Sequence, residues 1–290
     1  MAVFAVLWAM DSKGHYAAER ELYALNKKFR VLSRDPEFTP SVSYADLAKE
    51  YERFIEKHPG APTVAPACLT LSRIRVMERA YDQAHAALEK MLELYAGDPL
   101  VAVQALEQKL LIYANENNLK ATLDVLGRMQ AQYPRTAHGL KAPIVRYNVL
   151  LKNKKAAEAG QALADAVNYY LSVMGGNTGS EFGLNASLML AQAYLLQENW
   201  EAAVGAWGDI LINYGNTGIL DSRQAEDVVR SMNTVAVTKL KSVDAVVAIY
   251  EKFMETHPGH PFNGAIKSMV ASLRAVMPAQ PEGAENPHEK

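Results

Sequence analysis

Two stretches of this 290-residue chain, 199 residues apart, are nearly the same. Residues 51–62 read YERFIEKHPGAP and residues 250–261 read YEKFMETHPGHP, so eight of the twelve positions are identical. The tetrad Gly-Asn-Thr-Gly also occurs twice, at 176–179 and 215–218. Repetition of this kind indicates an array of similar structural units, each stacked on its neighbours.

Helix-breaking residues recur along the chain at intervals of 35–43 residues. They are Pro59, Pro99, Pro134, Gly175, Gly215 and Pro258. Proline cannot donate the helical hydrogen bond, and glycine supplies the left-handed conformation that often closes a helix. We therefore expect helices to stop at these places, with about two helices in each interval.

Between the breakers, apolar residues follow helical rather than strand spacing. In residues 187–211, Leu190 and Tyr194 share one helical face, and Ala203, Trp207 and Ile210 share the next, after a break at Glu198-Asn199. A three-and-four rhythm is typical of helices with one buried stripe, and no segment alternates for long with the period of a strand. The sequence predicts an all-α protein.

The segment from Ser187 to Gly215 resembles the tetratricopeptide repeat, or TPR. The family pattern is matched by Leu190-Ala191, Tyr194, Trp200, Ala203 and Trp207, with Gly215 where the family has proline. Partial matches elsewhere extend the resemblance over residues 41–277. The resemblance implies a right-handed α-solenoid of about six TPR-like helix pairs, with residues 263–276 as a C-terminal capping helix. The unit around residues 152–174 departs most, with a longer second helix.

The ending Tyr-x-x-Phe-x-x-x-x-Pro-Gly is similar to bacterial envelope TPR proteins, among them the outer-membrane assembly lipoprotein and the tol-pal accessory protein. Residues 1–12 begin with ten apolar residues, too few to cross a bilayer and similar to the apolar part of a secretion signal. Met10 and Asp11 stand where a lipoprotein signal would place its acylated cysteine. The resemblance implies the periplasm or cell envelope, with peripheral membrane association as an option and the cytoplasm as the alternative.

The remaining segments complete the expected organisation. Residues 13–40 are expected to form an N-terminal helix and a linker, and residues 41–277 the repeat array. Residues 278–290 contain three prolines and no large apolar side chain, so we expect a disordered tail.

No residue pattern predicts catalysis, a metal or a cofactor. The single cysteine, Cys68, excludes an intrachain disulfide and fits a small buried apolar residue. His58 and His257 precede the same proline in the repeated motif, which a turn explains, and His257 and His260 lack further ligands for a metal. The glycine-rich residues 175–179 lack the strand and the lysine of a phosphate loop. Thirty basic and 32 acidic residues, without a clustered positive excess, argue against nucleic acid, and the short basic run Lys152, Lys154 and Lys155 fits a solvated turn.

The resemblance implies a non-catalytic scaffold or adaptor that binds a protein or peptide in a concave groove lined by the first helices of the pairs. Its expected groove residues are Asn185, Leu188, Gln192 and Leu196, with Arg73 in the place that corresponds to Gln192. Two alternatives stay open. One is a helical-toroid enzyme acting on carbohydrate or lipid, and the other is a passive structural subunit of an envelope assembly.

Overall fold

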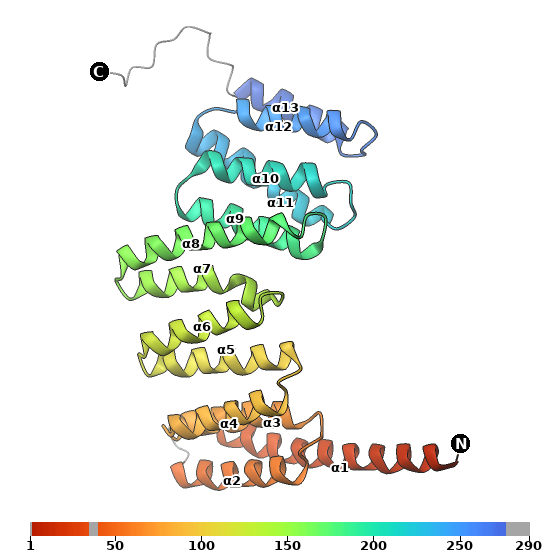
Figure 1. Ribbon diagram of the computed structural model, residues 1–290, viewed down its shortest axis with the longest axis vertical. Helices are drawn as coiled ribbons and strands as arrows, with labels where there is room; N and C mark the ends of the chain where they lie inside the picture. The colour runs from red at the N-terminus through yellow and green to blue at the C-terminus, as the bar shows by residue number, and fades with distance from the viewer. Residues whose placement is uncertain (1, 35–39, 277–290) are drawn as a thin grey trace. The chain divides into compact units, whose positions relative to one another are not determined.

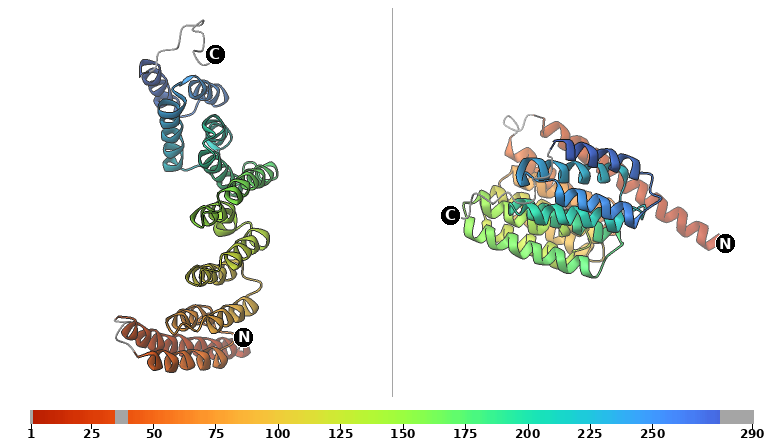
Figure 2. Two further views of the ribbon diagram at one scale, coloured as in Figure 1. Left: turned by 90° about the vertical axis from the view of Figure 1, so that its left-hand side faces the viewer. Right: turned by 90° about the horizontal axis from the view of Figure 1, so that it is seen from above.

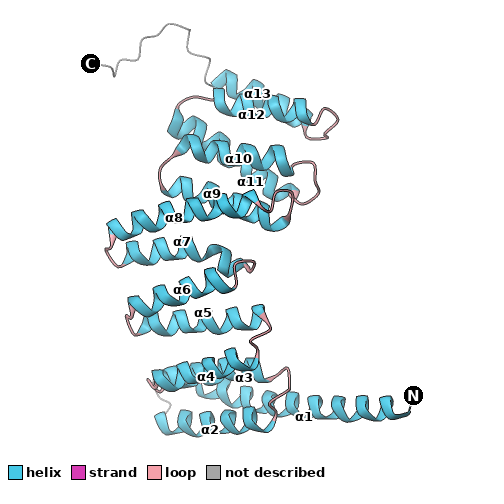
Figure 3. Cartoon of the chain, in the orientation of Figure 1, coloured by secondary structure: helices cyan, strands magenta, loops and turns pink. Residues whose placement is uncertain are grey.

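The computed structural model describes residues 2–34 and 40–276, which form two compact units, residues 1–142 and 143–290 (Figure 1). Every regular element in these described residues is a helix, and no β-strand occurs among them (Figure 3). The all-α prediction is confirmed. None of the helices in these ranges combines the length and the apolar character that crossing a bilayer requires.

Unit 1 is a succession of helices in which each packs against the next one along the chain. α1 packs on α2, α2 on α3, and so on to α6, with a further contact between α3 and α5. The bounds are Ala2–Leu32 for α1, Ser41–Lys57 for α2, Val64–Met77 for α3, Tyr81–Leu94 for α4, Pro99–Asn115 for α5 and Leu119–Gln132 for α6. α7 (Ala137–Lys152) contains the boundary between the units, next to Pro143 within the helix.

Unit 2 continues with the same sequential packing. α8 packs on α9, α9 on α10, α10 on both α11 and α12, and α12 on α13. The bounds are Ala156–Gly175 for α8, Glu181–Leu196 for α9, Trp200–Tyr214 for α10, Ser222–Val235 for α11, Asp244–Thr256 for α12 and Asn263–Val276 for α13. A short π-helix, η1 (Ala236–Leu240), follows α11 directly. Figure 2 shows both units from two further directions.

The apolar stripes read from the sequence form the core of these helix pairs. In α9 and α10, Ala191 and Ala203 are fully buried and Trp207 is 6% exposed, as expected for the apolar stripes. Small residues allow two helices to approach closely, and the large indole fills the space beside them. α8 has 20 residues, which confirms the longer helix expected for residues 152–174.

Four of the turns between paired helices have the same backbone geometry. In the turn between α3 and α4, Arg79 has φ 60°, its N–H donates to the Val76 carbonyl, and the N–H of Ala80 donates to the Arg75 carbonyl. This is the Schellman arrangement, which satisfies carbonyl groups that a helix end leaves open. The same two bonds are made at Asn117, Lys154 and Glu198, whose φ values are 52°, 60° and 57°.

The two glycines that the sequence suggested as left-handed helix ends, Gly175 and Gly215, do not have positive φ. Gly215, at the C-cap of α10, has φ −60°, and Gly175 is the last residue of α8. Positive φ occurs instead at Gly179 and Gly218, the final residues of the two Gly-Asn-Thr-Gly tetrads, at 78° and 73°. The tetrads are turns, as predicted, but the prediction of left-handed helix closure at Gly175 and Gly215 was wrong.

Glycine at position 215 is instead required by close packing. A Cβ added there would lie 2.7 Å from Cε2 of Phe253 and 2.5 Å from the carbonyl oxygen of Leu211. Pro99 was expected to mark the end of a helix. It is instead the first residue of α5, directly after the N-cap Asp98. Proline is well tolerated in the first helical turn, where its missing N–H would have no partner.

The N-terminal helix α1 continues without a break from the apolar segment 1–12 into residues 13–32. The predicted disordered tail, residues 278–290, lies outside the described residues. α13 has the bounds expected for the capping helix and buries Ile266, Val270 and Leu273.

Candidate binding surfaces

The predicted groove residues lie on two helices in different units. Asn185, Leu188, Gln192 and Leu196 lie on α9 in unit 2, where Gln192 is exposed and the other three are half-buried. The opposite side of α9 is fully buried, so these four residues are on its accessible side. Arg73 is an exposed residue of α3 in unit 1.

Arg73 and Gln192 occupy equivalent positions, as the sequence suggested. Each lies six residues before the left-handed residue of its turn, Arg79 and Glu198 respectively. The same count from the turns at Asn117 and Lys154 leads to Leu111 on α5 and Asn148 on α7. All four side chains are exposed, and Leu111 is 61% exposed although it is apolar. We call these four residues, Arg73, Leu111, Asn148 and Gln192, the ladder positions.

Sequence reasoning missed Leu111 and Asn148. A signal existed, since counting back six residues from each short inter-helix turn reaches both of them. The turn residues themselves gave no cue, because Asn117 and Lys154 are not glycine. Within unit 1, Arg73 Nε donates a long hydrogen bond of 3.4 Å to Gln108 Oε1 on α5, which links the first helices of two successive pairs.

A second surface in unit 1 is a groove between α1 and α2, with a volume of about 580 Å³. We call it the α1–α2 groove; its lining residues are Ala24, Lys27, Lys28, Val31, Leu32, Ser43, Asp46, Leu47 and Glu50. Its floor is apolar, and Val31 is 68% exposed. Lys28 Nζ and Glu50 Oε2 lie 2.5 Å apart and join the two helices in an ion pair.

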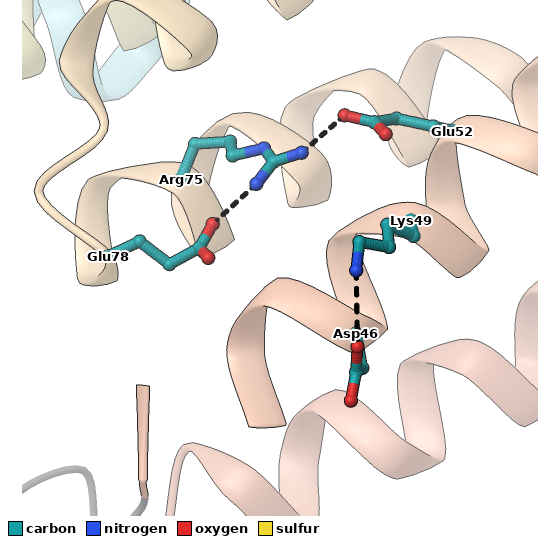
Figure 4. A network of polar contacts seen from close by, with 5 residues as sticks. All are labelled: Asp46, Lys49, Glu52, Arg75 and Glu78. Atoms are coloured by element: carbon teal, nitrogen blue, oxygen red, sulfur yellow. Dashed lines mark hydrogen bonds and ion pairs between the residues drawn. The ribbon is translucent and has the colours of Figure 1, made fainter. Parts of the chain in front are cut away.

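The third surface is a hollow of about 420 Å³ among α2, α3 and α4, and its lining is more polar than that of the α1–α2 groove. Arg75 on α3 forms part of its wall and is 12% exposed in its side chain. Its guanidinium donates to Glu52 Oε1 on α2 at 2.5 Å and to Glu78 Oε2 at 2.9 Å (Figure 4). Burial by itself would lower the pKa of Arg75, but its hydrogen bonds to the two carboxylates outweigh that effect and raise it.

Figure 4 shows a second, surface-exposed ion pair beside these partly buried contacts of Arg75. Lys49 and Asp46, one helical turn apart on α2, are 3.5 Å apart and both are well exposed. Exposed pairs of this kind contribute little to stability. The Arg75–Glu52 contact therefore holds α2 against α3, and the Arg75–Glu78 contact lies at the end of α3 itself. The Asp46 carboxylate stays accessible at the rim of the α1–α2 groove.

Cys68 lines the third hollow but is not a reactive thiol. Its residue is fully buried, and burial raises the pKa of the thiol to about 11. At neutral pH the thiol is therefore protonated, and the thiolate is the nucleophilic form. This agrees with the interpretation of Cys68 as a small buried apolar residue.

The histidines of the repeated motif are turn residues. His58 caps the end of α2 with its Nε2 3.0 Å from Glu21 Oε2, and His257 caps the end of α12 with its Nε2 3.0 Å from the Ile212 carbonyl oxygen. Each ring also lies against the phenylalanine one turn earlier, at 5.0 Å and 4.9 Å between ring centroids. Lys57 and His58 together lower the pKa of Glu21. In the described ranges, no three His, Cys, Asp or Glu side chains are grouped closely enough to hold a metal ion.

No family model matches the chain, and no curated protein matches it. One solved structure with some similarity is the crystal structure of BtubC (BKLC) from P. vanneervenii, which is 14% identical over 96% of this chain and 95% of that one. The TM-score of 0.38 is too low to support an inference about fold detail or function.

Proposed function

We propose that this chain is a non-catalytic helical-repeat scaffold that binds a protein or peptide partner. In this proposal the helix pairs are of TPR type, about six in number and stacked with a right-handed turn, and α13 closes the array. The sequential packing of helices within each unit and the recurrent turn geometry support it. Repeats that each contact only their neighbours present long rows of equivalent side chains, a common basis for protein recognition.

The observation that carries the proposal is the set of ladder positions. Four first helices present an exposed side chain at the same point relative to the turn, and the set combines a cation, an apolar group and two amides. In unit 1, Leu111 is 61% exposed, and a large exposed apolar side chain provides an anchor for a partner. In unit 2, the amide side chains of Asn148 and Gln192 can donate and accept hydrogen bonds along an extended peptide backbone.

The cell envelope is the proposed location, on the strength of the resemblance to envelope TPR proteins in the Tyr-x-x-Phe-x-x-x-x-Pro-Gly endings. Fractionation of the source cells tests this part separately. Recovery of the chain only with cytosolic markers would contradict it without affecting the binding proposal.

Affinity purification from the source cells tests the binding proposal. The full chain, shown to be folded by circular dichroism, is compared with the variants Leu111→Asp and Gln192→Ala and with the control Lys120→Ala, whose side chain is 88% exposed on α6. We expect a partner that binds the wild-type chain and the control, and that is depleted at least tenfold by Leu111→Asp. Failure of the folded wild-type chain to retain any protein would contradict the proposal.

A further inference from the structure

The α1–α2 hairpin and the α11–α12 hairpin, called here the first and last hairpins, correspond to each other in a specific register. The repeated motif aligns α2 with α12, so that Tyr51 corresponds to Tyr250. Each tyrosine hydroxyl donates to an asparagine on the preceding helix, Asn26 on α1 at 2.7 Å and Asn233 on α11 at 2.8 Å. These two bonds fix which residue of one hairpin corresponds to which residue of the other.

In the last hairpin, one side is covered by the helix that precedes it. α10 packs on both α11 and α12, and Ile249 of α12 lies so close to Gly208 of α10 that a Cβ there would be 2.6 Å from Ile249 Cδ1. Lys239 of η1 lies over the ring of Trp200 of α10, 4.8 Å from its centroid. This side of α11–α12 is therefore an interface for one helix.

By the same register, part of the α1–α2 groove lies on the corresponding side of the first hairpin. By the register above, Glu50 takes the place of Ile249, Leu47 that of the fully buried Val246, and Lys28 that of the buried Val235. No further helix covers this side in the part of unit 1 that the structure describes, and Figure 1 shows α1 and α2 at its edge. In the described part of unit 1, no helix takes the place that α10 holds on α11 and α12.

The charged residues that stand in place of apolar ones explain why this surface can remain exposed to water without loss of stability. Where the last hairpin has the apolar Val235 and Ile249, the groove has the Lys28–Glu50 ion pair, with side-chain exposures of 55% and 37%. An exposed ion pair is almost neutral for stability, whereas an exposed apolar pair would lose the free energy of its burial. Such a surface suits a partner that binds and leaves.

We propose that the α1–α2 groove binds one amphipathic helix of another protein, laid along α1 and α2 as α10 lies on α11 and α12. The inference rests on the proposed function, since it names one partner-binding site and the form of the bound segment. Lys28 and Glu50 pair with each other, which leaves Lys27 as a basic group on the α1 edge and Asp46 as an acidic group on the α2 edge. The bound helix therefore carries an apolar stripe with acidic residues on its α1 side and basic residues on its α2 side.

A second copy of the chain is a poorer occupant. In α13, the last described helix, the apolar side chains Ile266, Val270 and Leu273 are buried. Its exposed side carries small and charged residues, among them Ser268, Ala271 and Arg274. Among the α13 residues whose burial is described, none of the fully exposed ones is a large apolar residue that could fill the groove above Val31 and Leu47, and Met269 is half-buried.

Site-specific photo-crosslinking in the source cells tests the inference. The photoreactive residue p-benzoylphenylalanine is placed in the full chain at Ala24, an exposed lining residue, and in a second sample at Gln192. Mass spectrometry identifies the cross-linked segment, and a synthetic peptide of that segment is titrated against the purified chain. Val31→Asp adds a charge on the groove floor, and Leu100→Asp is the matched control, since Val31 and Leu100 are 68% and 70% exposed.

We expect the Ala24 probe to capture a segment of another protein whose peptide gains helical circular dichroism on binding. Its affinity falls at least tenfold with Val31→Asp and is unchanged with Leu100→Asp. Cross-links to a second copy, binding without gain of helix, or full affinity for Val31→Asp would each overturn the inference. Capture at Gln192 but not at Ala24 refutes the inference alone, and capture at neither position refutes the proposed function as well.

Discussion

The hydroxyl of Tyr51 donates a 2.7 Å hydrogen bond to Asn26 Oδ1, joining two helices across 25 residues of sequence. Tyr51 is fully buried, so its hydroxyl cannot exchange this partner for water. The same bond recurs between Tyr250 and Asn233 at the other end of the chain. A buried hydroxyl needs a partner, and an asparagine of the preceding helix provides it in both copies of the motif.

Replacing Tyr51 by phenylalanine is expected to lower the free energy of unfolding by about 1 kcal/mol, the usual net contribution of a hydrogen bond. The ring and its packing remain, so a larger loss would indicate a change of structure. Urea denaturation measures the difference. Tyr16→Phe is the control, because Tyr16 is 68% exposed and the variant is expected to unfold like the wild type.

Buried tyrosines make the fold sensitive to alkali. Burial raises the pKa of Tyr51, Tyr170 and Tyr250 above the ordinary tyrosine value. A pKa raised in the folded state means that the stabilisation is complete below the unfolded-state pKa, about 10, and is lost as pH rises above it. Chemical denaturation between pH 8 and 11 is expected to show constant stability to about pH 10 and then a decline. A variant with phenylalanine at all three positions is expected to lose less stability above pH 10 than the wild type. An equal loss in the two proteins would show that other groups cause the decline.

The turn residue Glu198 is a position where glycine is expected to stabilise the protein. Its φ of 57° is left-handed, which a side chain disfavours and glycine adopts freely. Glu198→Gly is expected to raise the free energy of unfolding by about 0.5–1 kcal/mol, since the relief of strain exceeds the added freedom of the unfolded chain. The adjacent Gln197 has φ −81°, so Gln197→Gly is expected to lower it. Thermal unfolding of the two variants should therefore move in opposite directions.

Two glycines on α10 should respond oppositely to alanine. Gly208 lies against Ile249, and a Cβ there would be 2.6 Å from Ile249 Cδ1, so Gly208→Ala is expected to cost about 1–3 kcal/mol by overpacking. Gly205 is exposed with nothing within 4 Å of an added Cβ, so Gly205→Ala is expected to gain up to about 1 kcal/mol of helix propensity. Adding Ile249→Val to Gly208→Ala removes Cδ1 and is expected to restore part of the loss. Absence of any restoration would place the strain elsewhere.

Helix positions and the core stripe were predictable because both depend on residues close in sequence. The break at Glu198-Asn199, the buried Ala191 and Ala203, and the length of α8 follow from local periodicity and from proline and glycine. The turn conformation was less predictable, because the left-handed residues Arg79, Asn117, Lys154 and Glu198 share no residue type. Their geometry follows from the close packing of the two helices on either side, which overrides the preference for glycine.

The helical and repetitive character of the chain follows from its sequence. Apolar residues spaced every three or four positions line up on one side of a chain segment only if that segment is a helix, and the recurring motif shows the repetition. Tertiary structure decided what each repeated position does. Ile249 and Glu50 each come directly before a copy of the motif, yet the first lies against α10 and the second lines an open groove. That difference depends on which helix packs next to each hairpin, a contact between residues distant in sequence that no local pattern specifies.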